Sequence, residues 1–553
     1  MLQILTDNLK LVFDNMKMNI IKISLALLFG ILSSNFAYAQ ETVDENIAQP
    51  MELPEYIIVR DAILNIKSGT KRFPEKIGPM SVAQLDSLNS LQKQQPILLP
   101  PEALPYKIMQ EKRRTGFIKG SAGLFSIINA QGEYRRDFGH FDAYGRAFIK
   151  NTGEFVDNAN AVDYGILLSS DYLADKKYWI MGGSRTRTTV NFRNRDYKLY
   201  SVSDAPERSL INFDVAVSTE GNYSGFAFCT GADLGFFKMS QNSANANDNN
   251  LSGYLKIKKV SDKYELGGNV AVDFHNVRGN GSHFLQANAF SSFLYGKFTF
   301  NINAGIQGAG NSDGTERGGL LLSVDADYRL SELFTISGGA LTGLNKNSFR
   351  QAAEMNPYVN NNSLVDFEYK MPMIKANLLY HPNVRYRMSL GTRFSATERT
   401  PVFLPNATDP DGTFVIDYVQ MNKIEIITEA FASISDKDKL FGNFTYTYSN
   451  MSNNDKQAPN MSALTAAADY KRQWTEEFGT QIGAIYIGER YADLDNSTSL
   501  DGFVNLSVSA NYQIINDIKV YIDFDNLTNS GIFIWNGYKE KGLFMSLGVL
   551  WQF

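Results

Sequence analysis

The sequence has very little cysteine and, after its first forty residues, no long apolar run. Its single cysteine, Cys229, cannot form an internal disulfide, and its place in "SGFAFCTGAD" indicates a small packing residue in a strand. A membrane-spanning helix needs roughly eighteen apolar residues in succession, so spanning helices are excluded from the mature chain. Any passage through a bilayer must therefore use strands.

Charge of one sign is also scarce. The formal net charge of -5 is small for 553 residues, and the absence of a basic block argues against nucleic acid as a partner. Only four histidines are present. One of them, His275, shares a predicted strand face with Asp273, which is the best support for an enzyme. No nucleophile or metal cluster can be placed beside this pair, so we expect no enzymatic activity, no cofactor and no metal.

The N-terminus has the pattern of a secretory signal. Lys17 and Lys22 flank the start of an apolar stretch at residues 23–32, and "AYA" precedes Gln40 as a cleavage site. We predict that residues 1–39 are an N-terminal extension and signal peptide. Residues 40–114 are irregular and rich in proline, as in "QQPILLPPEALPYK", and are predicted to be a periplasmic or lumen-filling segment.

From residue 115 to 553, apolar and polar residues alternate in segments of about eight to thirteen. The last segment, "KGLFMSLGVLWQF", places Leu547 and Val549 on one parity and Ser546 and Gly548 on the other. Successive side chains of a strand point to opposite faces, so each such strand has an apolar face and a polar or small one. Repeated over the whole region, this pattern indicates a barrel with an apolar exterior and a hydrophilic bore.

Short and long connections alternate along the same region. Ten tight turns, among them "ADKKY", "SDKYE" and "INDIK", are separated by long polar connections such as "SQNSANANDNN", "NVRGNGSH" and "LNKNSFRQAAEMNPYVNNNS". Ten hairpins and one further strand at each end give about twenty-two strands. The predicted fold is therefore all-β, a transmembrane antiparallel β-barrel preceded by a short irregular periplasmic segment.

A barrel of this kind implies how its strands close, which membrane it lies in and that its lumen is filled. An unpaired strand edge cannot lie in hydrocarbon, so the last strand must pair with the first. We expect the protein in the outer membrane of a Gram-negative cell, in contact with lipid and lipopolysaccharide. A lumen of this width must also be filled, either by residues 41–114, by infolded loops such as 343–363 and 397–414, or by a separate protein.

The C-terminal stretch "VYIDFDNLTNSGIFIWNGYKEKGLFMSLGVLWQF" resembles the final strands of TonB-dependent receptor barrels, in which an N-L-x-N turn, an aromatic-rich loop and a terminal aromatic residue recur. The resemblance implies that Trp551 and Phe553 belong to the signal read by the barrel-assembly machinery. Members of this family carry a plug domain before the barrel, and the interval before residue 115 is much shorter than such a plug. The resemblance therefore implies a plugless or plug-reduced relative.

Further upstream, "ELPEYIIVRD" is similar to the hydrophobic segment near the start of such receptors, where the TonB box lies. This similarity implies TonB as a partner. The residues concerned are Leu53, Pro54, Glu55, Tyr56, Ile57, Ile58 and Val59.

The segment "GGSRTRTTVNFRNRD" has four arginines on one parity, namely Arg185, Arg187, Arg193 and Arg195. Lining the bore, they would form a basic ladder for an anionic solute, because guanidinium pairs well with carboxylate and phosphate. Alternatively, they pair with acids on neighbouring strands or with lipopolysaccharide phosphates. The stretch "NATDPDGT", with Asp409 and Asp411, offers two calcium ligands, but it is also good turn chemistry, and we predict no metal site there.

These features predict an outer-membrane β-barrel involved in solute uptake or surface ligand binding. Two alternatives remain open: a passive porin-like channel gated by its N-terminal segment or loops, and a structural or adhesion barrel. Solute specificity depends on side chains that become neighbours across distant strands, so the sequence leaves the solute undefined.

Overall fold

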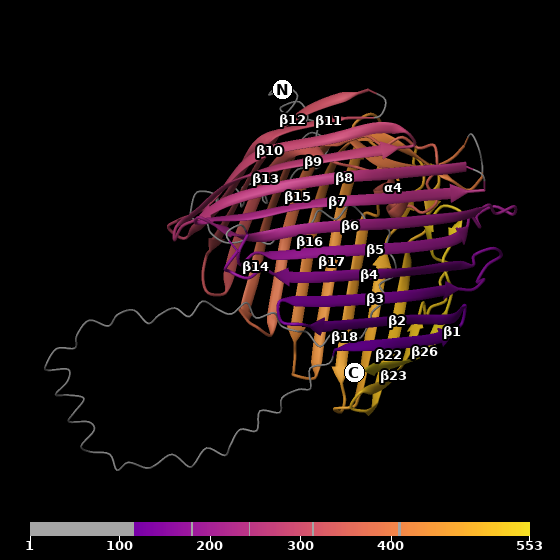
Figure 1. Cartoon of the computed structure of the whole chain (residues 1–553). Coiled ribbons are helices and arrows are strands. Elements are labelled where there is room, and N and C mark those ends of the chain that lie inside the picture. Colours follow the sequence, from indigo (N-terminus) through magenta and orange to yellow (C-terminus); the bar gives the residue numbers. More distant parts are fainter. Residues whose placement is uncertain (1–114, 179–180, 243, 312–313, 408–410) are drawn as a thin grey trace, which may run out of the picture. The chain divides into compact units, whose positions relative to one another are not determined.

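The computed structural model describes residues 115–553 except 179–180, 243, 312–313 and 408–410. The predicted signal peptide and the 40–114 segment lie outside these residues. Within the described part, twenty-two strands form one sheet in which β1 pairs with both β2 and β26, so the sheet closes into a barrel (Figure 1). The prediction of an all-β antiparallel barrel of about twenty-two strands is confirmed.

The first half of the wall follows the chain from one neighbour to the next. Its strands are β1 (Gly116–Gly123), β2 (Ser126–Asp137), β3 (Phe141–Thr152), β4 (Ala161–Leu173), β5 (Arg185–Lys198), β6 (Glu207–Tyr223), β7 (Phe226–Gln241), β8 (Ala244–Val260), β9 (Tyr264–Val277), β10 (Asn280–Tyr295) and β11 (Phe298–Gly310).

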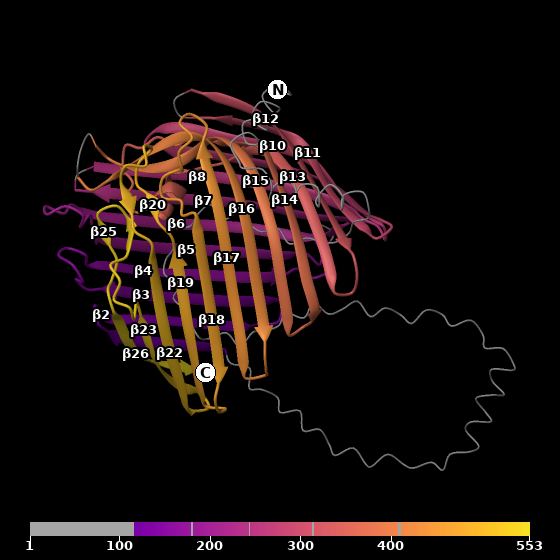
Figure 2. The same ribbon diagram turned by 180° about the vertical axis from the view of Figure 1, so that it is seen from behind.

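The second half returns to the starting strand, and Figure 2 shows it from behind. Its strands are β12 (Glu316–Arg329), β13 (Phe334–Asn345), β14 (Glu368–Asn383), β15 (Tyr386–Pro405), β16 (Phe414–Ser433), β17 (Asp438–Met451), β18 (Leu464–Gln473), β19 (Phe478–Ile487), β22 (Phe503–Ile515), β23 (Ile518–Asp525) and β26 (Phe544–Gln552).

The remaining elements belong to connections between wall strands. They are the helix α4 (Phe349–Met355), the hairpin of β20 (Arg490–Tyr491) with β21 (Ser499–Leu500), and the hairpin of β24 (Phe533–Trp535) with β25 (Tyr538–Lys539). Within the described residues, no helix is long and apolar enough to cross a membrane.

The two faces of the wall differ as the alternation predicts. On β26, Leu547 is 60% exposed and Trp551 is 46% exposed, whereas Ser546 and Leu550, on the other parity, are buried. The outward residues form an apolar surface suited to lipid, and the inward residues face the bore. The barrel is therefore an outer-membrane barrel in its surface chemistry as well as in its closure.

All ten predicted tight turns join consecutive wall strands, but two of the predicted long loops are absent. The stretches "SQNSANANDNN" and "NVRGNGSH" lie mostly within β7–β10, and Arg278 and Gly279 alone join β9 to β10. Both have positive φ, 54° and 87°, as a type I′ hairpin turn requires. The strands continue beyond the lipid, where both faces meet water, so polarity there no longer distinguishes a strand from a loop.

Candidate functional site: the lumen and the loops that enter it

The four ladder arginines lie on the inner face of β5, as their shared parity predicts. On the neighbouring β4, Ile166 and Leu168 are exposed on the outer face, whereas Asp171 lies on the opposite face and pairs with the arginines. Its carboxylate is 2.8 Å from the Arg185 guanidinium and 3.0 Å from that of Arg187. One acid is therefore shared by two basic side chains.

The other two ladder arginines also have partners. The Nε of Arg193 donates to Asp163 Oδ1 over 2.9 Å, and the Arg195 guanidinium lies 5.2 Å from the centre of the Tyr197 ring. The structure thus contains the contacts expected from pairing with neighbouring strands. Ligand binding by this ladder remains a prediction.

Further along the wall, the bore is lined by a neutral ladder of amides on β9, β10 and β11. Asn269 donates to Asn288 over 3.2 Å, and Asn288 donates to Asn303 over 2.8 Å. Gln307 donates to Gln286 over 3.0 Å in a second row. Gln307 is buried and also bonds the backbone of Leu344, whereas the half-buried Asn269 and Asn303 have donor and acceptor capacity beyond these contacts and can exchange hydrogen bonds with water or a polar solute.

Several charged residues elsewhere in the bore are also paired with opposite charges. Representative pairs are Lys258 with Glu265 at 3.0 Å, Lys375 with Asp325 at 2.9 Å and Arg393 with Glu425 at 3.3 Å. The bore is therefore hydrophilic, and in these pairs the charges of nearby strands neutralise each other.

The connection between β13 and β14, residues 346–367, folds into the lumen and contains α4. The helix begins at Ser348, whose side chain accepts a hydrogen bond from the Gln351 backbone N–H, while the Gln351 side chain accepts from the Ser348 backbone N–H. Pro357 follows the helix end. This capping box starts a short amphipathic helix of about two turns, with Phe349 and Ala353 on its buried side.

The buried side of this connection packs against the inner surface of the opposite strands. The Phe349 ring lies 6.0 Å from the ring of Phe237 on β7, and both side chains are almost fully buried. Tyr358 stacks on Tyr538 of β25 with ring centres 3.4 Å apart. The connection that includes residues 346–363 therefore packs against inward-facing side chains, and α4 in Figure 1 and β25 in Figure 2 lie at the same end of the barrel. That this loop fills the lumen remains a prediction.

The second predicted infolded loop, 397–414, is different. Most of it is the extended end of β15, which pairs with β16 as far as Pro405 and Phe414. The Phe403 and Phe414 side chains nevertheless join the apolar cluster around Tyr358. Because strand pairing satisfies its backbone, this segment forms part of the wall rather than a loop in the bore.

Two wall arginines bind the backbone of the infolded connection. Arg208 donates to the carbonyl oxygens of Pro357 and Val359 over 2.9 and 2.7 Å. Arg278 donates to those of Asn361 and Ser363 over 2.8 and 3.0 Å.

Neither of these arginines is predicted by a pattern in the sequence. Their roles depend on carbonyl groups more than eighty positions away in the sequence. The capping box was the one local signal that a structured element lay in this connection.

Asp273 and His275 do lie on one face, but among charged groups rather than in a catalytic arrangement. His275 Nδ1 is 2.7 Å from Asp248 Oδ1, and its Nε2 is 2.9 Å from Asp273 Oδ1. Lys346 of the infolded connection pairs with Asp273. The three wall residues therefore form a docking surface for the connection.

The predicted calcium alternative falls partly outside the described residues, because Asp409 is not among them. Asp411 Oδ1 accepts a hydrogen bond from the Thr413 backbone N–H at 2.9 Å, and Asp411 Oδ2 accepts one from Gln241 at 3.1 Å. These are the contacts of a turn residue.

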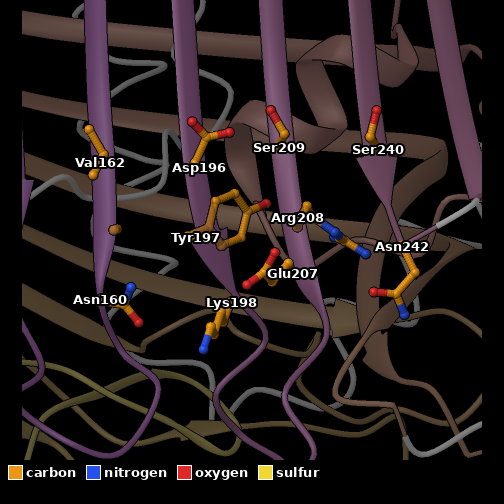
Figure 3. Close-up of a pocket in the computed structure, with 11 residues that line it drawn as sticks. Asn160, Val162, Asp196, Tyr197, Lys198, Glu207, Arg208, Ser209, Ser240 and Asn242 are labelled. Carbon is orange, nitrogen blue, oxygen red and sulfur yellow. The ribbon is translucent and has the colours of Figure 1, made fainter.

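A pocket of about 380 Å³ lies at the loop ends of β4, β5, β6 and β7, next to the arginine ladder (Figure 3). Its charged lining residues are Asp196, Lys198, Glu207 and Arg208. Two acids face two bases, and none of the four predicted arginines lines it. This pocket is therefore not the anion site that the ladder suggested.

The remaining predicted site residues are at the chain ends. Residues 53–59, which resemble a TonB box, lie outside the described residues. Phe553 closes the barrel: its carbonyl oxygen accepts hydrogen bonds from the backbone N–H groups of Thr115 and Gly116 at 2.6 and 3.0 Å, and its ring stacks on Tyr134. Trp551 points outward on the same strand.

A closed barrel of twenty-two antiparallel strands, apolar outside and polar inside, defines the class as an outer-membrane β-barrel. Residues 427–527 match the family model described as "TonB dependent receptor-like, beta-barrel". This match lies within the barrel and agrees with the resemblance to TonB-dependent receptor barrels seen in the last strands.

Solved structures agree on the fold. The siderophore receptor PiuA from Acinetobacter baumannii has 12% identity and a TM-score of 0.63, with 79% of this chain and 82% of that chain covered. The FrpB iron transporter from Neisseria meningitidis has 9% identity and a TM-score of 0.64, covering 79% and 81%. The ferric-catecholate import receptor Fiu from K12 E. coli has 10% identity and a TM-score of 0.61, covering 80% and 82%. Among curated protein sequences, none matches this chain.

Proposed function

We propose that this protein binds a hydrophilic solute at the cell surface and takes it up across the outer membrane through the barrel. The observation that carries the proposal is the closed barrel of the TonB-dependent receptor type with a polar, locally neutral bore. A bore in which acids and bases are already paired presents hydrogen-bonding groups without a strong field of one sign. This supports recognition of the solute by contacts at the loops rather than by bulk charge.

Chelated metal ions are the solutes to test first, because the structurally similar proteins include iron and copper transporters. The expected result is that cells expressing the protein accumulate a labelled ferric or cupric chelate faster than cells lacking it. Equal accumulation across a panel of chelates, peptides and oligosaccharides would reject uptake as the function.

Energy coupling through TonB rests on the resemblance of residues 53–59 to a TonB box. Deleting these seven residues is expected to abolish uptake and the capture of a purified TonB periplasmic domain. Deleting residues 41–47, which are equal in number and also follow the signal peptide, is the matched control and should preserve both. Unchanged uptake after the first deletion would exclude energised transport through this segment.

The porin-like alternative is favoured by one observation, the infolded connection 346–367, since a loop that narrows the bore is a means of gating a passive channel. Planar-bilayer recordings of the full chain distinguish a passive channel from a receptor. A large, persistent current supports the passive channel, whereas silence supports a receptor with an occupied lumen.

A further inference from the structure

The connection of residues 346–367 has a distinctive attachment to the barrel. Apart from its two covalent ends on β13 and β14, this connection forms one isolated backbone bridge to a described strand, between Val359 and Phe414. Its other hydrogen bonds to the wall, including those from Arg208 and Arg278, involve side chains. The rest of its position is determined by side-chain contacts. Such an element can change position without unpairing the wall.

Two basic residues of this connection, Lys346 and Arg350, pair with acids on the wall strands β6, β8 and β9. The Arg350 guanidinium donates to Asp214 Oδ2 over 2.9 Å, and the Arg350 backbone N–H donates to Asp248 Oδ2 over 2.9 Å. Lys346 pairs with Asp273. We call these five residues the latch.

The latch acts across the bore rather than along it. Its acids lie on β6, β8 and β9, four to seven strands away from β13 in the order of the sheet. Neighbouring strands are about 4.8 Å apart, so these positions are roughly 20–35 Å along the wall from the root of the connection. The connection must therefore cross part of the lumen to reach them.

The electrostatics of the latch favour the docked position. Burial by itself would lower the pKa of Arg350, but hydrogen bonding to Asp214 and the nearby Glu354 outweigh it and raise that pKa. Other charged groups facing the latch are Asp233 on β7 and His275 on β9. The docked Arg350 guanidinium therefore remains charged, whereas burial lowers the pKa of Lys346. Both groups have lost water on docking, and the neighbouring carboxylates replace its hydrogen bonds.

An apolar surface lies beneath the latch and is covered by the connection itself. Ala353 of α4 has no exposed surface, and Phe349 beside it is equally buried against Phe237 and Met239 of β7. If the connection left the wall, these residues would meet water. Exposure of Ala353 is therefore a direct report on the docked state.

We propose that residues 346–367 are a lid across the extracellular mouth of the bore, and that the latch holds this lid shut. The lid regulates entry to the lumen, so its role in uptake depends on the proposed function, whereas its opening can be measured without any solute. Contacts that compete for Lys346 or Arg350 open the lid, and an anionic group on an arriving solute is the chemistry suited to that competition.

The test uses cysteine accessibility in whole cells that express the full chain. Cys229 is first replaced in Cys229→Ser, and Ala353→Cys is then introduced as the reporter. With the latch intact, a membrane-impermeant maleimide should not label the reporter. Adding Arg350→Glu should raise the labelling rate by about tenfold or more, the scale expected when one partner of a desolvated ion pair is lost.

Two matched controls separate lid opening from general loosening. Ala458, which is fully buried in a different apolar cluster near the β17–β18 connection, becomes the second reporter in Ala458→Cys and should stay unlabelled with Arg350→Glu. Arg393→Glu disrupts a partly buried ion pair away from the latch, that with Glu425 on the neighbouring strand, and should leave the Ala353→Cys reporter unlabelled.

A charge exchange tests the ion pair itself. Combining Asp214→Arg with Arg350→Asp should return labelling toward the closed level. The proposal is overturned if Arg350→Glu leaves the Ala353→Cys reporter unlabelled, if that reporter is labelled with the latch intact, or if both reporters become accessible together. If cells show latch-dependent labelling but no uptake, the proposed function is rejected and the proposal of a lid is retained.

Discussion

At the scale of single residues, the bore depends on partners supplied by other strands. Arg193 and Asp163 illustrate this: the acid is buried, while the arginine side chain retains 35% of its exposure toward the lumen. Replacing Arg193 with Met leaves a buried carboxylate without this partner. We expect a loss of about 2 kcal/mol, less than for a dry ion pair because lumen water screens the charge.

Urea unfolding of the purified barrel in detergent measures this loss. The double variant Asp163→Asn with Arg193→Met removes both charges and should recover most of the stability. A single variant as stable as the parent would show that the pair contributes nothing.

A second residue-scale prediction concerns Asp493, in the connection between β20 and β21. Partial burial alone would raise the pKa of this carboxyl, but hydrogen bonds from Ser497 and Thr498 lower it to about 2. The ionised form stabilises the folded turn, so this stabilisation is complete above the ordinary value of 3.8 and is lost as the pH falls toward about 2.

Hydrogen exchange of the peptide covering residues 490–500 tests the prediction. Compared with the parent, Asp493→Ala should exchange faster at neutral pH, and the difference should vanish below about pH 2. A difference that persists unchanged in strong acid would contradict this role for the carboxylate.

At the scale of elements, the two faces of each wall strand predict opposite tolerances. Leu547 near the middle of β26 faces lipid, and Ser507 on β22 faces the bore. Leu547→Lys should destabilise the barrel by about 2–4 kcal/mol in a lipid bilayer, because the ammonium meets hydrocarbon. Ser507→Lys, the matched control, should cost much less. Folding titrations into lipid vesicles measure both, and equal costs would contradict the assignment of the faces.

At the scale of the whole molecule, the barrel is closed by the pairing of β1 with β26, and Phe553 adds to this closure. The Phe553 carbonyl oxygen bonds to the first strand, and the ring stacks on Tyr134. If the ring is also the assembly signal, Phe553→Ala should sharply reduce the amount of heat-modifiable barrel in cells while leaving refolding into detergent nearly intact. Tyr134→Ala removes the same ring contact and should assemble normally. Equal assembly of both variants would reject the signal.

The local periodicity of the sequence was sufficient for the barrel. Alternation along strands such as β26 and the ten tight turns fix strand number and face, because each depends on residues close together in the chain. The parity of the four arginines was predictable for the same reason. The prediction of long loops was wrong at the β7–β8 and β9–β10 hairpins. There the strands extend beyond the lipid, and polarity no longer distinguishes a strand from a loop.

The sequence by itself therefore determined the class, the number of strands and which side chains face the bore. Only the tertiary structure decided that Arg185 and Arg187 share Asp171, that Arg208 and Arg278 hold the connection 346–367, and that Lys346 and Arg350 meet acids on β6, β8 and β9. These contacts join residues far apart in the chain, and barrel closure together with the path of one loop brings them within hydrogen-bond distance. No local sequence pattern predicts contacts between residues so far apart in the chain.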